Sequence, residues 1–140
     1  MTTLLSCTSN VLAPSNPLRE FTTDGCSMAS NGTPTRPQSL LRCCVDHDYL
    51  YWSGGTSEER LKADESFKAC VSHAESPELG RLYYNAVRLG GSTAFKTRFY
   101  WGYGWTQKRP DTPLTRSELQ QVLDQSRKIN WDEIFQNFKH

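Results

Sequence analysis

The sequence predicts an all-α domain in which disulfides staple an antiparallel pair of helices, with further helices toward the C-terminus. Three observations predict it. The stretch 43–52 places two cysteines, a histidine and several aromatic residues within about three helical turns. Helix-start signals occur at Thr56, Ser76 and Thr115. Paired glycines interrupt the chain between these segments and end the helices before them.

The composition excludes several classes of function. A formal net charge of +1 argues against a nucleic-acid-binding surface and against an acidic tail. No apolar run has the length of a membrane span. The length of 140 residues suits one domain, and 36% hydrophobic residues give a modest core. Cross-links should therefore help to hold the fold.

Four of the five cysteines can supply those cross-links. Cys26, Cys43, Cys44 and Cys70 lie in the middle of the chain. A bond between the adjacent Cys43 and Cys44 would close a strained ring, which leaves two pairing schemes. In either scheme, one bridge ties the Cys26 loop to the 43–52 helix and the other ties the Cys70 segment to it. Metal ligation is the competing interpretation, but no CxxC pair is present. Disulfides imply an oxidising compartment outside the cytosol.

The fifth cysteine, Cys7, follows Leu4, Leu5 and Ser6, and this run resembles a bacterial lipobox. A lipobox cysteine is lipidated, so we expect an exported protein, either held at the bacterial cell envelope or secreted. The start site would then lie upstream of Met1. The alternative is a disordered N-terminus with one incidental cysteine. We expect residues 1–19 to form a tether and residues 20–140 to form the domain.

The central helices follow a loop. Residues 21–37 are rich in glycine, proline, serine and threonine, which is typical of a loop. A first helix is expected from about 37–40 to Trp52, before Ser53 and two glycines stop it. Thr56 opens a capping box for a second helix over 58–73. Because the connection is short, the two helices should form an antiparallel hairpin.

The C-terminal half predicts three more helical pieces. Ser76 caps the first, which ends at two glycines, and Thr115 caps the second. The tail over 131–138 should add a short helical piece. The first carries an apolar face made of Leu79, Leu82, Tyr83, Ala86, Val87 and Leu89. The aromatic segment 95–105 could meet a membrane interface, but we prefer a role in the core.

Polar side chains on the first expected helix indicate a site for acid–base chemistry. Cys43, His47 and Tyr51 follow at four-residue spacing on one face, and Asp48 lies on the neighbouring row. Asp64 can approach His47 from the second helix once Cys70 is bridged back. A carboxylate on one imidazole nitrogen leaves the other nitrogen free as a base. The loop before the helix can turn carbonyl oxygens toward a hard cation.

These motifs together resemble the secreted phospholipases A2. Residues 43–51 are similar to the CCxxHDxxY active-site helix of that family, and Asp64 with Cys70 matches its second aspartate and bridging cysteine. Residues 21–27 resemble the DGCS calcium-loop signature of the prokaryotic branch. The resemblance covers about a third of the chain, 21–71. It implies the disulfides Cys26–Cys44 and Cys43–Cys70.

The resemblance also implies roles for individual residues. His47 would be the general base for the water that attacks the sn-2 ester of a glycerophospholipid, Asp64 would orient it, and Tyr51 would support Asp64. Asp48 would hold Ca²⁺ with loop ligands, which are expected at Asp24, Gly25 and Ser27. The expected partner is a phospholipid surface, with no nucleic acid, and the expected state is a monomer.

The chain also departs from the family. Leu50 stands where animal members have a cysteine, and the residues after Cys26 lack their glycine-rich calcium loop. The alternative function is therefore a non-catalytic, disulfide-stapled module that binds a lipid or a protein. A third interpretation treats His47 and Asp48 as a structural polar pair.

Overall fold

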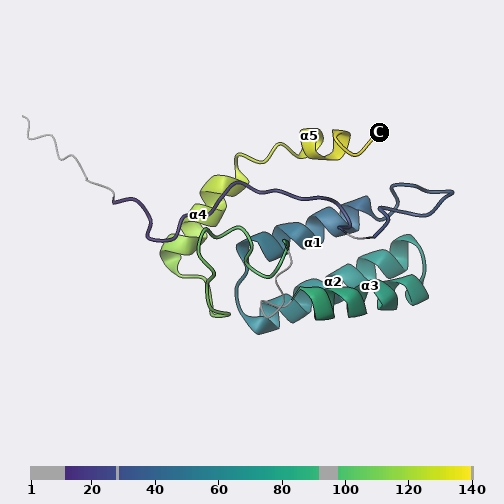
Figure 1. Cartoon of the computed structure of the whole chain (residues 1–140), viewed down its shortest axis with the longest axis horizontal. Coiled ribbons are helices and arrows are strands. Elements are labelled where there is room, and N and C mark those ends of the chain that lie inside the picture. The colour runs from purple at the N-terminus through teal and green to yellow at the C-terminus, as the bar shows by residue number, and fades with distance from the viewer. Residues whose placement is uncertain (1–11, 28, 92–97, 140) are drawn as a thin grey trace, which may run out of the picture.

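The computed structural model describes residues 12–27, 29–91 and 98–139, and this part of the chain is helical with no β-strand. Turns and irregular segments connect the helices (Figure 1). The five helices within the described residues are α1 (Leu41–Ser53), α2 (Ser57–Ala74), α3 (Pro77–Gly90), α4 (Arg116–Ser126) and α5 (Trp131–Gln136). The predicted all-α class is confirmed for the described residues.

Side-chain caps start α2, α3 and α4, as the sequence predicts. Thr56 and Thr115 each close a capping box, with Glu59 and Glu118 respectively. The Ser76 side chain accepts a hydrogen bond from the backbone N–H three residues later. Each cap satisfies N–H groups that the first helical turn leaves unpaired. A cap is a signal within four residues of sequence, which is why these starts could be predicted.

The start of α1 is held differently. Leu40 occupies the N-cap position and provides no side-chain hydrogen bond, although its backbone N–H donates to Asn31 O at 2.7 Å. Its side chain is fully buried, and the disulfide-bonded Cys43 and Cys44 follow within the first turn. Residues 37–40 form turns before the helix. Tertiary contacts therefore fix this helix start.

Helix α2 lies beside both α1 and α3 (Figure 1). One buried cluster of side chains lies where these helices meet. A Cβ added at Gly80 of α3 would collide with Ser72 and would lie 2.8 Å from Lys68 O, both on α2. The absence of a side chain at Gly80 therefore lets the two helices approach closely. The buried members of this cluster are Leu40, Cys43, Cys44, Phe67 and Val71.

The apolar face of α3 is narrower than predicted. Leu79, Tyr83 and Val87 pack against the cluster, but Leu82 and Leu89 are 64% and 69% exposed. Residues at positions 79, 83 and 87 follow four-residue spacing, so they form one row on the helix, and this row contacts the cluster. Leu82 and Leu89 lie outside that row, and their side chains face away from the core. Apolar character alone did not distinguish the two rows.

Aromatic residues form a second buried cluster. The indole N–H groups of Trp101 and Trp105 donate to Gly55 O at 3.0 Å and Ser53 O at 2.7 Å, so the aromatic segment is fixed on the connection between α1 and α2. The described part of that segment packs as core, and residues 95–97 lie outside the described residues. The buried members are Leu18, Tyr51, Trp52, Ala63, Trp101, Tyr103 and Trp105.

The N-terminal segment joins the C-terminal helices to this core. The Leu18 backbone donates to the Gln121 side chain at 2.9 Å and accepts from the Gln125 side chain at 3.1 Å, both on α4. Trp131, at the start of α5, contacts the ring of Phe21. The helical piece predicted over the tail is present as α5.

Cys7 and its lipobox lie outside the described residues. Of the expected 1–19 tether, the structure describes residues from 12 onward, and within it the Leu18 side chain is buried. Among the described helices, none combines the length and the apolar character that crossing a bilayer requires.

The ion pair between Arg109 and Glu118 gives a test of this fold. The two side chains are 7% and 18% exposed, and Arg109 Nε donates to Glu118 Oε2 at 2.8 Å. Burial alone would raise the pKa of Glu118, but hydrogen bonds from Arg109 and the Thr115 backbone outweigh it and lower the pKa. Glu118→Gln keeps a residue that suits a capping box and removes the charge. We expect a loss of about 2 kcal/mol of stability at neutral pH.

The lowered pKa also fixes the sign of the pH dependence. The stabilisation by Glu118 is complete above the ordinary glutamate pKa and is lost as pH falls through the lowered value. Urea unfolding of wild type and Glu118→Gln should therefore differ at neutral pH and converge in acid. A difference that stayed constant with pH would contradict this account.

Candidate functional site

Two buried side chains on neighbouring helices form a hydrogen-bonded pair. His47 Nε2 on α1 lies 2.7 Å from Asp64 Oδ1 on α2, and Tyr51 OH donates to the same oxygen at 2.7 Å. His47 is 7% exposed and Asp64 is fully buried. The imidazole also contacts the rings of Tyr51 and Phe67, with centroids 4.2 and 4.5 Å away. The structure thus brings the three predicted catalytic residues together.

The spacing along the two helices explains this meeting. The Cys43–Cys70 disulfide joins the start of α1 to the end of α2. Measured from it at 1.5 Å per residue, His47 and Tyr51 lie about 6 and 12 Å along α1. Asp64 lies about 9 Å along α2 on the same basis. Asp64 is therefore level with the midpoint between the two side chains that it contacts.

The Asp64 carboxylate determines which imidazole nitrogen carries the proton. Its burial would raise the pKa, but hydrogen bonds from His47, Tyr51 and Arg88 outweigh that effect and lower it. An ionised carboxylate only accepts hydrogen bonds, so His47 Nε2 donates to it. In the neutral ring, Nδ1 then carries a lone pair, and it has no hydrogen-bond partner among the described residues. A histidine in this state can act as a base.

Two arginines complete the surroundings of Asp64, and sequence reasoning missed both. Arg88 donates to Asp64 Oδ2 at 2.7 Å, and Arg60 Nε lies 4.0 Å from the same oxygen. Arg60 also donates to Tyr51 OH at 3.0 Å. The four-residue spacing of Arg60 and Asp64 was a usable signal. Arg88 comes from α3, and no local pattern pointed to it.

Asp48 lies on the neighbouring row of α1, with a 6% exposed side chain. Thr23 Oγ1 donates to its Oδ2 at 2.6 Å. Burial raises the pKa of Asp48 to about 7, the Thr23 hydrogen bond lowers it, and the negative charge of Asp24 raises it. Among the described residues, no arginine, lysine or histidine forms an ion pair with Asp48. Within the part of the chain that the structure describes, this carboxylate is therefore buried without a counter-charge, and Thr23 was not predicted as its partner.

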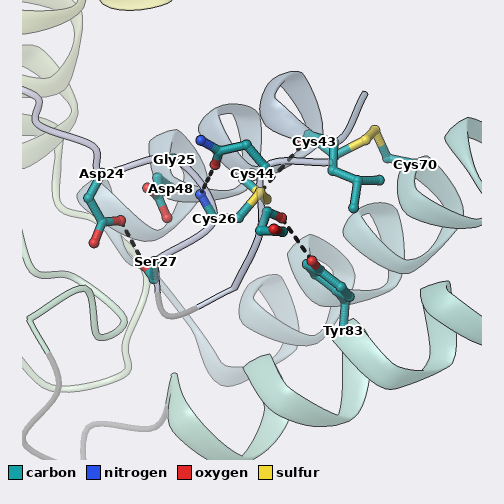
Figure 2. Close-up of a disulfide and its surroundings, with 12 residues drawn as sticks. Asp24, Gly25, Cys26, Ser27, Cys43, Cys44, Asp48, Cys70 and Tyr83 are labelled. Atoms are coloured by element: carbon teal, nitrogen blue, oxygen red, sulfur yellow. Dashed lines mark hydrogen bonds between the residues drawn. A yellow bond between two sulfur atoms is a disulfide. The ribbon is translucent and has the colours of Figure 1, made fainter. Parts of the chain in front are cut away.

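The predicted loop ligands lie beside Asp48. Figure 2 shows Asp24 and Ser27 turned toward each other, and Ser27 Oγ donates to Asp24 Oδ1 at 2.8 Å. Gly25 has a positive φ of 75°, and its N–H donates to the Thr23 hydroxyl that contacts Asp48. The Cys26–Cys44 disulfide ties this loop to α1 (Figure 2).

The donor chemistry of this region fits a hard cation. The side-chain oxygens available as metal ligands belong to two carboxylates and to hydroxyl groups. A buried carboxylate that forms no ion pair with the described residues also favours a positive ion nearby. The described residues contain no cluster of three or more histidine, cysteine or acidic side chains at metal-binding distance. Any cation here would therefore need backbone oxygens from the loop in addition to Asp48 and Asp24.

Comparison with known proteins adds no relative, since no family model, curated protein or solved structure matches the chain. The side chains described above are therefore the features that indicate a function. They form two adjoining groups: a histidine held by a buried carboxylate, and a second buried carboxylate that forms no ion pair within the described residues.

Removal of the Asp64 charge gives a test of the site geometry. Asp64→Asn leaves Arg88 and Arg60 partly buried without their counter-charge, so we expect a loss of about 2–4 kcal/mol of stability. The matched control is Asp46→Asn on α1, where an exposed pair with Arg42 should contribute at most about 1 kcal/mol. Guanidinium unfolding with intact disulfides measures both. Equal losses in the two variants would show that Asp64 is not held as described.

Proposed function

We propose that this protein is a calcium-dependent lipid hydrolase of the phospholipase A2 type, which cleaves the sn-2 ester of glycerophospholipids. The observation that carries the proposal concerns two neighbours on α1: among the described residues, His47 Nδ1 has no hydrogen-bond partner and the buried carboxylate of Asp48 has no ion-pair partner. The disulfide-stapled hairpin of α1 and α2 and the loop before α1 would then form an active site and a calcium loop. The sequence resemblance and this geometry both support the proposal.

The residues would divide the reaction as follows. His47 Nδ1 takes a proton from the water that attacks the ester carbonyl, and the imidazolium later returns it to the leaving alkoxide. Asp64 stabilises the imidazolium and fixes the ring. Tyr51 donates to Asp64 and limits its rotation. No covalent acyl-enzyme is needed.

Calcium, when bound, would supply a Lewis acid for the ester oxygen and its developing negative charge. Asp48 and Asp24 would hold it, with backbone oxygens at Gly25 and Ser27. Ser27 Oγ would then give up its hydrogen bond to Asp24, and the Thr23 hydroxyl would keep its hydrogen bond to Asp48 or be replaced by the ion.

A non-catalytic module is the second candidate, and one observation favours it. Both carboxylates of the proposed calcium site already accept hydrogen bonds from neighbouring hydroxyl groups, of Thr23 and of Ser27. A loop held by these hydrogen bonds can have a purely structural role, without a bound calcium ion. In either case, the two disulfides favour export to an oxidising compartment, where the protein would meet a phospholipid surface as a monomer.

Ester hydrolysis by variants of α1 tests the proposal. Release of fatty acid from phosphatidylcholine vesicles should require calcium and stop with chelator. His47→Gln should reduce the rate by about 10²–10⁴-fold, because the variant lacks the base. Asp46→Asn, on the exposed side of the same helix, should retain the wild-type rate. If wild type, the chelated protein and His47→Gln all match background on several lipid compositions, the non-catalytic module is favoured.

Calcium binding can be measured without substrate. Protons should compete with calcium for Asp48, whose pKa is raised to about 7 by burial. The apparent calcium Kd should therefore weaken by up to about tenfold per pH unit below pH 7 and level off above it. Isothermal titration calorimetry of wild type, Asp48→Asn and Asp46→Asn gives the test. Equal affinity in wild type and Asp48→Asn would remove Asp48 from the site.

A further inference from the structure

The end of α3 reaches the buried pair of α1 and α2. Arg88 Nη1 donates to Asp64 Oδ2 at 2.7 Å, while His47 and Tyr51 share Oδ1. Arg60 Nη2 donates to Val87 O at 3.1 Å and to Arg88 O at 2.8 Å. The two oxygens of Asp64 thus serve different partners, and Arg88 is the direct partner of Oδ2.

The backbone after Arg88 also lies against this pair. A Cβ added at Gly91 would collide with the Tyr51 ring and hydroxyl. Gly91 O accepts a hydrogen bond from Trp101 N at 3.1 Å, which fixes the end of α3 on the aromatic core. Arg88 therefore approaches Asp64 from a backbone that is itself held in place.

We propose that Arg88 is a positioning residue that keeps Nδ1 of His47 free by fixing the Asp64 carboxylate. Two physical effects support this role. Without Arg88, Oδ2 would lose its hydrogen bond within a fully buried group, and the carboxylate would rotate toward its remaining donors. Burial would also favour a protonated Asp64. A protonated carboxyl donates to Nε2, which moves the imidazole proton to Nδ1 and blocks the base.

The role in catalysis rests on the proposed function, but the position of the proton does not. Long-range ¹H–¹⁵N correlation spectra of histidine-labelled protein distinguish the two neutral tautomers without substrate. Wild type should show His47 with the proton on Nε2. In Arg88→Gln, the ratio of the Nε2–H to the Nδ1–H form should fall by about tenfold, the effect expected for loss of one charge-assisted hydrogen bond.

Two further variants separate an effect on the position of the His47 proton from a general loss of stability. Arg88→Lys restores a cationic donor and should restore most of the Nε2–H form. Arg81→Gln, which removes an exposed arginine on the same helix that pairs with Glu78, should leave the tautomer unchanged. A wild-type tautomer ratio in Arg88→Gln would overturn the proposal, as would a failure of Arg88→Lys to differ from Arg88→Gln.

A measurement on the wild type alone decides the question if Arg88→Gln does not fold. A guanidinium held on a buried carboxylate rotates slowly, so Arg88 should give separate, slowly exchanging Nη proton signals, whereas Arg81 should give averaged ones. Averaged signals for Arg88 would overturn the proposal.

The outcomes also separate this proposal from the proposed function. A protein that shows the expected tautomers but hydrolyses no lipid would count against lipid hydrolysis only. An active protein whose tautomer is unchanged in Arg88→Gln would count against the role of Arg88 only.

Discussion

The packing of α1, α2 and α3 against one another is organised by one fully buried carboxylate, that of Asp64. Burying an ionised group costs several kcal/mol unless donors replace the lost water. Here the donors are His47 and Tyr51 on α1 and Arg88 on α3, and the guanidinium of Arg60 on α2 adds a positive charge 4.0 Å away. Each helix must keep its position along its neighbours for these contacts to form. Satisfying a single charge therefore fixes the relative positions of α1, α2 and α3.

The two adjacent cysteines of α1 form disulfides with two different segments of the chain. Neighbouring residues on a helix point about 100° apart, so Cys43 faces α2 and Cys44 faces the loop before α1. One turn later, the same separation directs His47 toward Asp64 and Asp48 toward Thr23. Each cysteine thus fastens the segment that the polar residue four positions later contacts. The proposed base and the proposed calcium ligand can in this way share one helix without sharing one environment.

Local signals in the sequence predicted where helices begin better than they predicted the tertiary contacts around those helices. The starts at Thr56, Ser76 and Thr115 depend on hydrogen bonds within four residues, and all three are present. The start of α1 depends on burial and disulfides, and the exposure of Leu82 depends on which row of α3 meets α2. Both are tertiary properties, and no short pattern encodes them.

The candidate site divides in the same way. The meeting of His47 with Asp64 follows from helix spacing and one disulfide, so the sequence was sufficient to predict it. The contacts of Thr23 and Arg88 join residues 25 and 24 positions from their partners, so only the folded chain reveals them. The catalytic and calcium-binding roles remain predictions.

The spacing from the two cysteines to His47 and Asp48 also limits how such a sequence can change. A residue inserted between Cys44 and His47 would turn the later side chains by about 100°, so both polar residues would leave their partners while both disulfides stayed closed. Substitutions on the outer side, at the exposed Arg42, Asp46 and Leu50, carry no such penalty. Over evolutionary time, this helix should therefore accept changes of composition far more readily than changes of length. Chains that retain the site would then share its intervals even where few other residues agree.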